Sequence, residues 1–214
     1  HAASYGTLPM AVLSDDPVAY LRTYAETYLY EEIKSEALTR NLGSFSRFLE
    51  IAARQNAQVT NASAIARDAA VSRQTVQNYF EILVDTLIGV WLPPWKLKRA
   101  TKQVAHPKFM FFDPGVARAL SGRLPYPPTR EELGPLLETL LHNEVRAYLS
   151  YTDRQYPLHF WQTHGGVEVD LFCEGRSRYV GIEIKASETW QKRYNRGLLR
   201  LRKELGASRV ACYG

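Results

Sequence analysis

Cysteine is scarce in this 214-residue sequence, which contains only Cys173 and Cys212. Two thiols make neither a disulfide framework nor a cysteine-rich zinc site, and they suit a reducing compartment, so we expect a cytoplasmic protein. No uninterrupted apolar run approaches the roughly 18 residues of a membrane span, so no membrane partner is expected. The first residues also lack the charged and apolar regions of a secretory signal. Because the sequence starts with His1 and stops at Gly214 just after an apolar run, we expect a fragment of a longer protein.

Several catalytic signatures are missing as well. The sequence has no G-x-x-x-x-G-K-[ST] loop to bind nucleotide phosphates, so it predicts no ATPase site. It has no G-x-S-x-G motif, which argues against a serine hydrolase. It has no C-x-x-C or H-E-x-x-H motif, and its histidines are scattered, which argues against a zinc site.

Basic residues are concentrated in two stretches of the chain. The formal net charge is +5, from 27 Lys and Arg against 22 Asp and Glu. Residues 91–108 include five basic side chains and no acid, and residues 192–204 include six basic side chains and one acid. Such clusters indicate a polyanion, and we take DNA as the expected partner. A solvated helix face would give the same pattern.

The stretch 61–88 has the pattern of a helix-turn-helix. A short helix is expected over 64–70, and Ser72 is expected to cap a longer helix over 73–88. The apolar side of the longer helix is predicted to contain Val76, Tyr79 or Phe80, Leu83 and Leu87. The exposed start of this helix has side chains that match base edges, and these are the predicted DNA-reading residues: Arg73, Gln74, Gln77 and Asn78.

Two strands, 89–95 and 108–112, are expected after this helix and would form a wing. The basic residues between them would contact DNA phosphates, and they are Lys96, Lys98, Arg99 and Lys102. The alternative is a winged helix that only packs or contacts protein.

The proline-rich stretch 121–128 predicts a domain boundary. We expect three parts: an N-terminal helical segment over 1–43, a mainly helical winged helix-turn-helix domain over 44–122, and an α/β domain with a mixed sheet over 129–214. The fold class is therefore α+β or α/β. The last part is expected to contain a helix over 134–150, strands over 158–163, 167–173 and 179–185, a basic helix over 190–205, and a strand from 209. The basic helix adds Arg196 and Arg200 to the predicted nucleic-acid contacts.

Two acids are expected to meet on adjacent strands of a hairpin in this last part. A loop of two or four residues pairs positions whose numbers sum to 353, which places Asp170 opposite Glu183. Because side chains alternate along a strand, Glu168 is expected on the same face of its strand as Asp170, and Lys185 on the same face of its strand as Glu183. Two carboxylates this close suit Mg²⁺ or Mn²⁺, and Lys185 would orient a water molecule or stabilise the transition state of phosphate-ester hydrolysis.

A further acid from the preceding helix would complete such a site, and Glu138 and Glu144 are the candidates. The order of helical acid, V-x-V-D strand and I-E-I-K strand resembles the PD-(D/E)xK nuclease superfamily, which includes restriction endonucleases and Holliday-junction resolvases. The resemblance implies that the catalytic residues are Glu138, Asp170, Glu183 and Lys185, and that Asp170 and Glu183 bind the metal. Val169 stands where that superfamily usually has proline. The alternative is a ladder of salt bridges on a solvated face.

Nearly all of the chain resembles the region that follows the ATPase module in a group of prokaryotic AAA-type ATPases of poorly defined function. The segments that carry this resemblance are Gly6-Thr-Leu-Pro9, Tyr20 to Leu29, Ser72 to Tyr79, Phe111 to Gly115, and the two acidic strands. The resemblance implies a winged helix followed by a restriction-endonuclease-like domain. It also implies that ATP binds only to the ATPase module of the full-length protein.

Three functions therefore remain open at this point. The first is a DNA-binding, nuclease-like region that hydrolyses phosphodiesters with Mg²⁺ or Mn²⁺. The second is a regulatory module that binds DNA or protein and has a degenerate nuclease fold. The third is a platform for homo-oligomerisation, which the tyrosines at spacing four in the first long helix favour.

Overall fold

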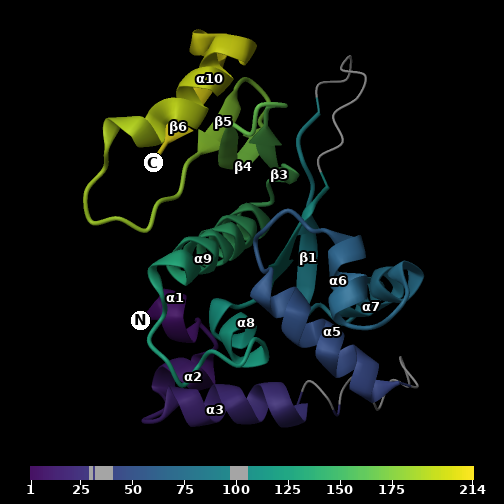
Figure 1. Cartoon of the computed structure of the whole chain (residues 1–214). Coiled ribbons are helices and arrows are strands. Elements are labelled where there is room, and N and C mark those ends of the chain that lie inside the picture. Colours follow the sequence, from purple (N-terminus) through teal and green to yellow (C-terminus); the bar gives the residue numbers. More distant parts are fainter. Residues whose placement is uncertain (29–30, 32–40, 97–105) are drawn as a thin grey trace. The chain divides into compact units, whose positions relative to one another are not determined.

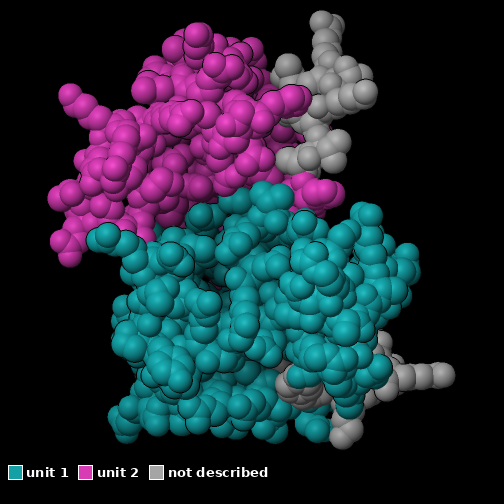
Figure 2. Space-filling view, viewed as in Figure 1, with its two compact units in different colours: residues 1–91, 108–140 teal, residues 92–107, 141–214 magenta. Residues whose placement is uncertain are grey.

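The computed structural model describes residues 1–28, 31, 41–96 and 106–214. Within these ranges the chain has a mixed α+β fold with a two-stranded sheet, β1-β2, and a four-stranded sheet, β3-β4-β5-β6 (Figure 1). The predicted α+β class is thus confirmed. The chain divides into a first unit, residues 1–91 with 108–140, and a second unit, residues 92–107 with 141–214 (Figure 2). None of the described helices has the length and hydropathy needed to cross a membrane.

Helices dominate the first unit, and polar side chains cap several of their starts. These helices are α1 (Ala2–Tyr5), α2 (Pro9–Leu13), α3 (Pro17–Thr23), the π-helix η1 (Tyr24–Tyr28), α5 (Leu42–Arg54), α6 (Ala62–Asp68), α7 (Arg73–Asp85) and α8 (Pro114–Leu120). A side-chain oxygen of the preceding residue accepts a backbone N–H at the starts of α3, α5, α6, α7 and α8. Each of these caps satisfies one of the N–H groups that the first helical turn leaves free.

The two helices predicted within 61–88 are confirmed as α6 and α7. Ser72 Oγ accepts the Thr75 N–H at 3.0 Å, as expected of the N-cap. The inner side of α7 is buried and consists of Val76, Tyr79, Phe80 and Leu83. The prediction that Leu87 belongs to this side is wrong, because α7 already ends at Asp85. Leu87 has a φ of 59° and is 78% exposed.

The strand predicted over 89–95 is shorter than expected. Strand β1 covers Gly89–Leu92, and it pairs with β2, which covers Lys108–Phe111. Trp95 belongs to the second unit, where its N–H donates to the Phe160 carbonyl oxygen at 2.7 Å. The Trp95 ring lies in the core of that unit, so hydrophobic burial explains why Trp95 does not belong to β1.

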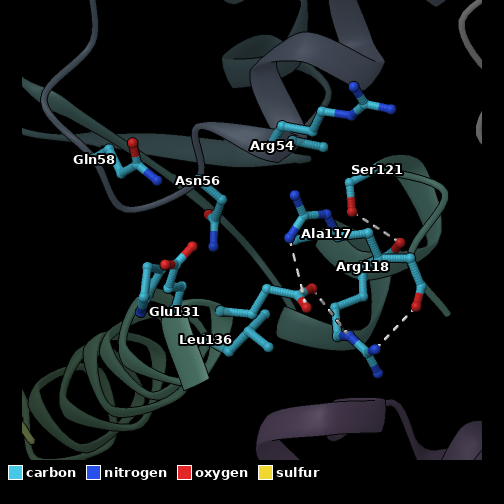
Figure 3. Close-up of a pocket in the computed structure, with 12 residues that line it drawn as sticks. Arg54, Asn56, Gln58, Ala117, Arg118, Ser121, Glu131 and Leu136 are labelled. Atoms are coloured by element: carbon cyan, nitrogen blue, oxygen red, sulfur yellow. Dashed lines mark hydrogen bonds and ion pairs between the residues drawn. The ribbon is translucent and has the colours of Figure 1, made fainter. Parts of the chain in front are cut away.

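A buried arginine connects several loops of the first unit. Arg118 is 2% exposed, and its guanidinium donates to the carbonyl oxygens of Ser4, Arg123 and Tyr126. It lines a polar pocket with Asn56 (Figure 3). Asn56 Nδ2 donates to Thr139 Oγ1, and Asn56 Oδ1 accepts the Phe111 N–H. Because buried polar groups are costly without partners, these contacts fix the loops around α8.

The division between the units falls within the long helix α9 (Arg130–Tyr151). The second unit also contains β3 (Leu158–Gln162), β4 (Glu168–Glu174), β5 (Tyr179–Ile182), the 3₁₀ turns Lys192–Asn195 and Ala207–Arg209, α10 (Arg196–Leu205) and β6 (Val210–Tyr213). Strands β3, β4 and β5 pair antiparallel, and β5 pairs with β6 in parallel. This confirms the predicted mixed sheet.

Helix α10 covers one face of this sheet. Leu198 and Leu201 of the helix join a buried cluster with Trp161, Val169 and Phe172 of the strands. Gly181 of β5 leaves room for them, since a Cβ there would lie 2.7 Å from a Leu201 methyl carbon. The core of the second unit therefore lies between α10 and this face.

Candidate functional site

The hairpin of β4 and β5 has the predicted register. Leu171 pairs with Ile182 and Glu174 pairs with Tyr179, so the residue numbers of each pair sum to 353. Four residues, 175–178, form the loop between the last pair. Asp170 comes one residue before Leu171 and Glu183 comes one residue after Ile182, so both acids lie at the same end of the hairpin. The even loop expected from the sequence is thus confirmed.

A bulge in β4 changes the orientation of the side chains near Asp170. Between the pairs His159–Phe172 and Trp161–Val169, β4 has one residue more than β3. We expected successive side chains of this stretch to point to opposite faces of the sheet. That prediction is wrong here, because Val169 and Phe172, three residues apart, both enter the core beside α10. Bulges of this kind redirect side chains and are common next to functional sites.

Asp170, Glu183 and Lys185 converge at this end of the hairpin. Lys185 Nζ lies 2.6 Å from Glu183 Oε1 and 3.3 Å from Asp170 Oδ2, and it donates to the Ile184 carbonyl oxygen at 2.9 Å. The Ile184 N–H donates to the same Asp170 oxygen at 2.7 Å. The strand predicted to reach residue 185 ends at Ile182, because the N–H of Ile184 bonds this side chain instead of a neighbouring strand.

Both carboxylates are buried, with residue exposures of 6% for Asp170 and 8% for Glu183. Burial, followed by the negative charge of Asp170, raises the pKa of Glu183 to about 7, although Lys185 opposes this shift. Burial lowers the pKa of Lys185, but Asp170 and Glu183 together outweigh it, so the net pKa is raised. The ammonium therefore stays charged and neutralises part of the acidic pair.

One oxygen of this cluster has no hydrogen-bond partner among the described residues. Glu183 Oε2 is buried and unsatisfied. It faces the first turn of α10, since a Cβ on Gly197 would lie 3.1 Å from it. A buried oxygen of this kind is costly unless a proton or a cation satisfies it.

Gly197 permits the close approach of α10 to the site. A Cβ at this position would lie 2.1 Å from the Glu168 carbonyl oxygen. The Glu168 side chain accepts from Gln162 Nε2 at 3.0 Å. Gly197 and Gln162 were not among the predicted site residues, although a glycine inside a predicted helix is a signal of close packing.

Two of the predicted nucleic-acid contacts lie beside this site. Arg196 and Arg200 of α10 line a hollow together with His164 of the β3–β4 turn. Arg200 Nε also pairs with Glu204 at 2.7 Å. This hollow, which we call the arginine hollow, is polar and adjoins the start of β4 through Val167.

The other predicted DNA contacts lie in α7 and after β1. Arg73, Gln74, Gln77 and Asn78 are all exposed on α7, as expected. Gln74 Nε2 donates to Asn78 Oδ1 at 3.0 Å. Lys96 is exposed, whereas Lys98, Arg99 and Lys102 lie outside the described residues. The exposed helix face is present, and its role in DNA binding remains a prediction.

Glu138, the predicted helical acid, lies in the first unit. Its Oε2 accepts from Lys108 Nζ at 3.0 Å, and the Lys108 side chain is only 4% exposed. The alternative acid, Glu144, is exposed on α9. Glu138 is thus held by a buried lysine, and its role as a third catalytic acid remains a prediction.

The acidic pair meets part of what a divalent cation requires. Mg²⁺ is usually bound by one or two carboxylates, and the unsatisfied Glu183 Oε2 is an oxygen that a cation would satisfy. Across the described ranges, no group of three or more His, Cys, Asp and Glu side chains is arranged to bind a metal ion. That Asp170 and Glu183 bind a metal ion therefore remains a prediction.

The structure is a mixed α+β chain in which Asp170, Glu183 and Lys185 form a cluster beside the basic helix α10. The chain belongs to the family described as Domain of unknown function (DUF8612), whose model matches residues 2–126. A second model, Domain of unknown function (DUF4143), matches residues 133–214.

Two curated mycobacterial proteins are similar to this chain. They are Uncharacterized protein Mb2031c of Mycobacterium bovis and Uncharacterized protein Rv2008c of Mycobacterium tuberculosis. Each is 26% identical over 179 residues, which cover 82% of this chain and 40% of the relative. The chain thus spans about 40% of the length of these relatives. No solved structure matches it.

Proposed function

We propose that this chain is the DNA-binding, nuclease-like C-terminal region of a prokaryotic AAA-type ATPase, and that it hydrolyses phosphodiesters with Mg²⁺ or Mn²⁺. The observation that carries the proposal is the convergence of Asp170, Glu183 and Lys185 at one end of the β4–β5 hairpin. In this proposal the second unit has a restriction-endonuclease-like fold, and the first contains a winged helix. The low cysteine content supports a cytoplasmic location.

Each residue of the cluster has a proposed role. Asp170 and Glu183 hold the metal, which would lower the pKa of a bound water molecule. Lys185 keeps its positive charge beside both acids and stabilises negative charge on the phosphate group. Arg196 and Arg200 in the arginine hollow bind phosphates of the same strand, because guanidinium groups bind phosphate through paired hydrogen bonds.

The first unit supplies DNA recognition in this proposal. The exposed side chains at the start of α7 include one guanidinium and three amides, which are the groups that match base edges in the major groove. The Gln74–Asn78 hydrogen bond orients two of them. ATP would bind only to the ATPase module of the full-length protein.

Cleavage assays in Mn²⁺ test the hydrolytic role. We expect supercoiled, linear or branched DNA to be cut by the wild-type chain and not by Asp170→Asn or Glu183→Gln, which keep side-chain shape and remove charge. Glu174→Gln is the matched control, because Glu174 is an exposed acid at the far end of the same strand. Equal cleavage by the wild type and by both site variants would point to a contaminating nuclease and end the proposal.

A non-catalytic module that binds DNA or protein is the second candidate. It is favoured by Lys185, whose ammonium contacts Asp170, Glu183 and the Ile184 carbonyl oxygen and so neutralises part of the acidic pair without a metal. If the chain binds DNA without cutting it, six phosphate contacts predict a slope of about −5 for log affinity against log salt. A flat salt response would instead favour a protein partner. Stable self-association in sedimentation would support the oligomerisation platform.

A further inference from the structure

The second unit has an apolar groove on the sheet face away from α10. Leu158, Leu171, Val180 and Ile182 share this face, because Leu171 pairs directly with Ile182 while Phe172 and Gly181 point to the α10 side. None of these four aliphatic residues belongs to the core beneath α10. We call this space, with its lining residues, the aliphatic groove.

Three structural elements enclose the aliphatic groove. Val145, Tyr148 and Leu149 of α9 form one wall, the sheet forms the second, and the β4–β5 turn forms the third. The cavity volume is about 440 Å³, which lies within the range of small-molecule sites. All of these residues belong to the second unit. The space is therefore large enough for an aliphatic chain.

Arginines are the charged residues that line the groove. They are Arg154, Arg176 and Arg178, all exposed, and no Asp or Glu lies among the described lining residues. None of the three forms an ion pair with another described residue. The Arg154 guanidinium lies 5.6 Å from the centre of the Tyr148 ring, which holds it at the α9 wall. The groove is thus apolar inside and positively charged at its rim.

We propose that the aliphatic groove binds an amphiphilic anion, a molecule with an aliphatic tail and a carboxylate or phosphate head. The tail would lie on Leu158, Leu171, Val180 and Ile182, and the head would bind the arginines at the turn. Guanidinium groups bind both kinds of head through paired hydrogen bonds. This proposal does not depend on the acidic cluster.

Calorimetric titration of the chain with decanoate, decyl phosphate and decyltrimethylammonium, each below its micellar concentration, tests the proposal. We expect one saturable site for at least one of the two anions and binding of the cation weaker by about tenfold or more, since one charge-assisted hydrogen bond accounts for that factor. Comparison of the two anions identifies the preferred head group. The proposal is overturned if neither anion saturates the protein or if the cation binds equally well.

Two variants locate the site. The double charge reversal Arg176→Glu with Arg178→Glu should weaken anion binding about tenfold or more, because repulsion replaces attraction at the rim. Val180→Trp should fill the groove and abolish binding. Lys203→Glu is the matched control, since Lys203 is exposed on α10, outside the groove, and its reversal should leave affinity unchanged. If circular dichroism shows that Val180→Trp is unfolded, the double charge reversal at the exposed turn still tests the location of the site. Unchanged binding by the double variant would refute the location.

Discussion

The pH dependence of stability should depend on Glu183. Its pKa rises from an ordinary 4.5 to about 7 in the folded chain, so between these values the folded state binds more protons than the unfolded state. Stability therefore falls as the pH rises through this window, by about 3 kcal/mol in total. Glu183→Gln removes this titration and the repulsion from Asp170. We expect the variant to match the wild type near pH 5 and to be more stable by about 2–3 kcal/mol at pH 8.

Urea unfolding of both proteins at several pH values between 5 and 8, with chelator present, measures this difference. Glu174→Gln, which changes an exposed acid at the other end of the β4–β5 hairpin, should follow the wild type throughout. If Glu183→Gln is no more stable than the wild type at pH 8, or differs from it equally at every pH, the reasoning about a buried, repelled carboxylate is wrong. Saturating Mn²⁺ should raise wild-type stability at pH 8 and leave Glu183→Gln unchanged if the acids bind metal.

Two further substitutions test the packing around the site and the first unit. Gly197→Ala places a Cβ 2.1 Å from the Glu168 carbonyl oxygen, so we expect about 1–3 kcal/mol lower stability, whereas Gly134→Ala, with open space at its Cβ, should be neutral or stabilising. Equal effects of the two in urea unfolding would refute the close contact of α10 with β4. Arg118→Met leaves buried carbonyl oxygens without their donor and should cost about 3 kcal/mol, against little for Arg123→Met, whose side chain is 47% exposed. A thermal melt in which both arginine variants resemble the wild type would contradict the role of Arg118.

The parts of the fold that depend on local periodicity were predictable from the sequence. The inner side of α7 follows from apolar spacing, and only its last residue, Leu87, was misplaced because the helix ended early. The hairpin register follows from alternation and an even loop, so the approach of Asp170 to Glu183 required no tertiary information. Lys185 then falls within reach of both acids.

Tertiary packing determined the features that the sequence did not predict. The bulge at Asp170 arises where β4 pairs with β3, and no local pattern in β4 marks it. The early end of the predicted 89–95 strand depends on Trp95, which enters the core of the second unit. Lys108, which the sequence placed in a basic stretch, is buried and paired with Glu138 about 30 positions along the chain. The periodicity of the sequence does not predict long-range contacts of this kind.

The two candidate functions differ in what satisfies the buried Glu183 Oε2. Lys185 contacts Glu183 Oε1 and Asp170 Oδ2, so it leaves Glu183 Oε2 unsatisfied. In a purely structural cluster a proton would fill this role, and the raised pKa makes that protonation accessible near neutral pH. In a nuclease a metal would displace the proton, because metal ligands must be deprotonated. A cation bound at Glu183 Oε2 would use an oxygen that Lys185 does not contact, so metal binding would not require the ammonium to leave the acids.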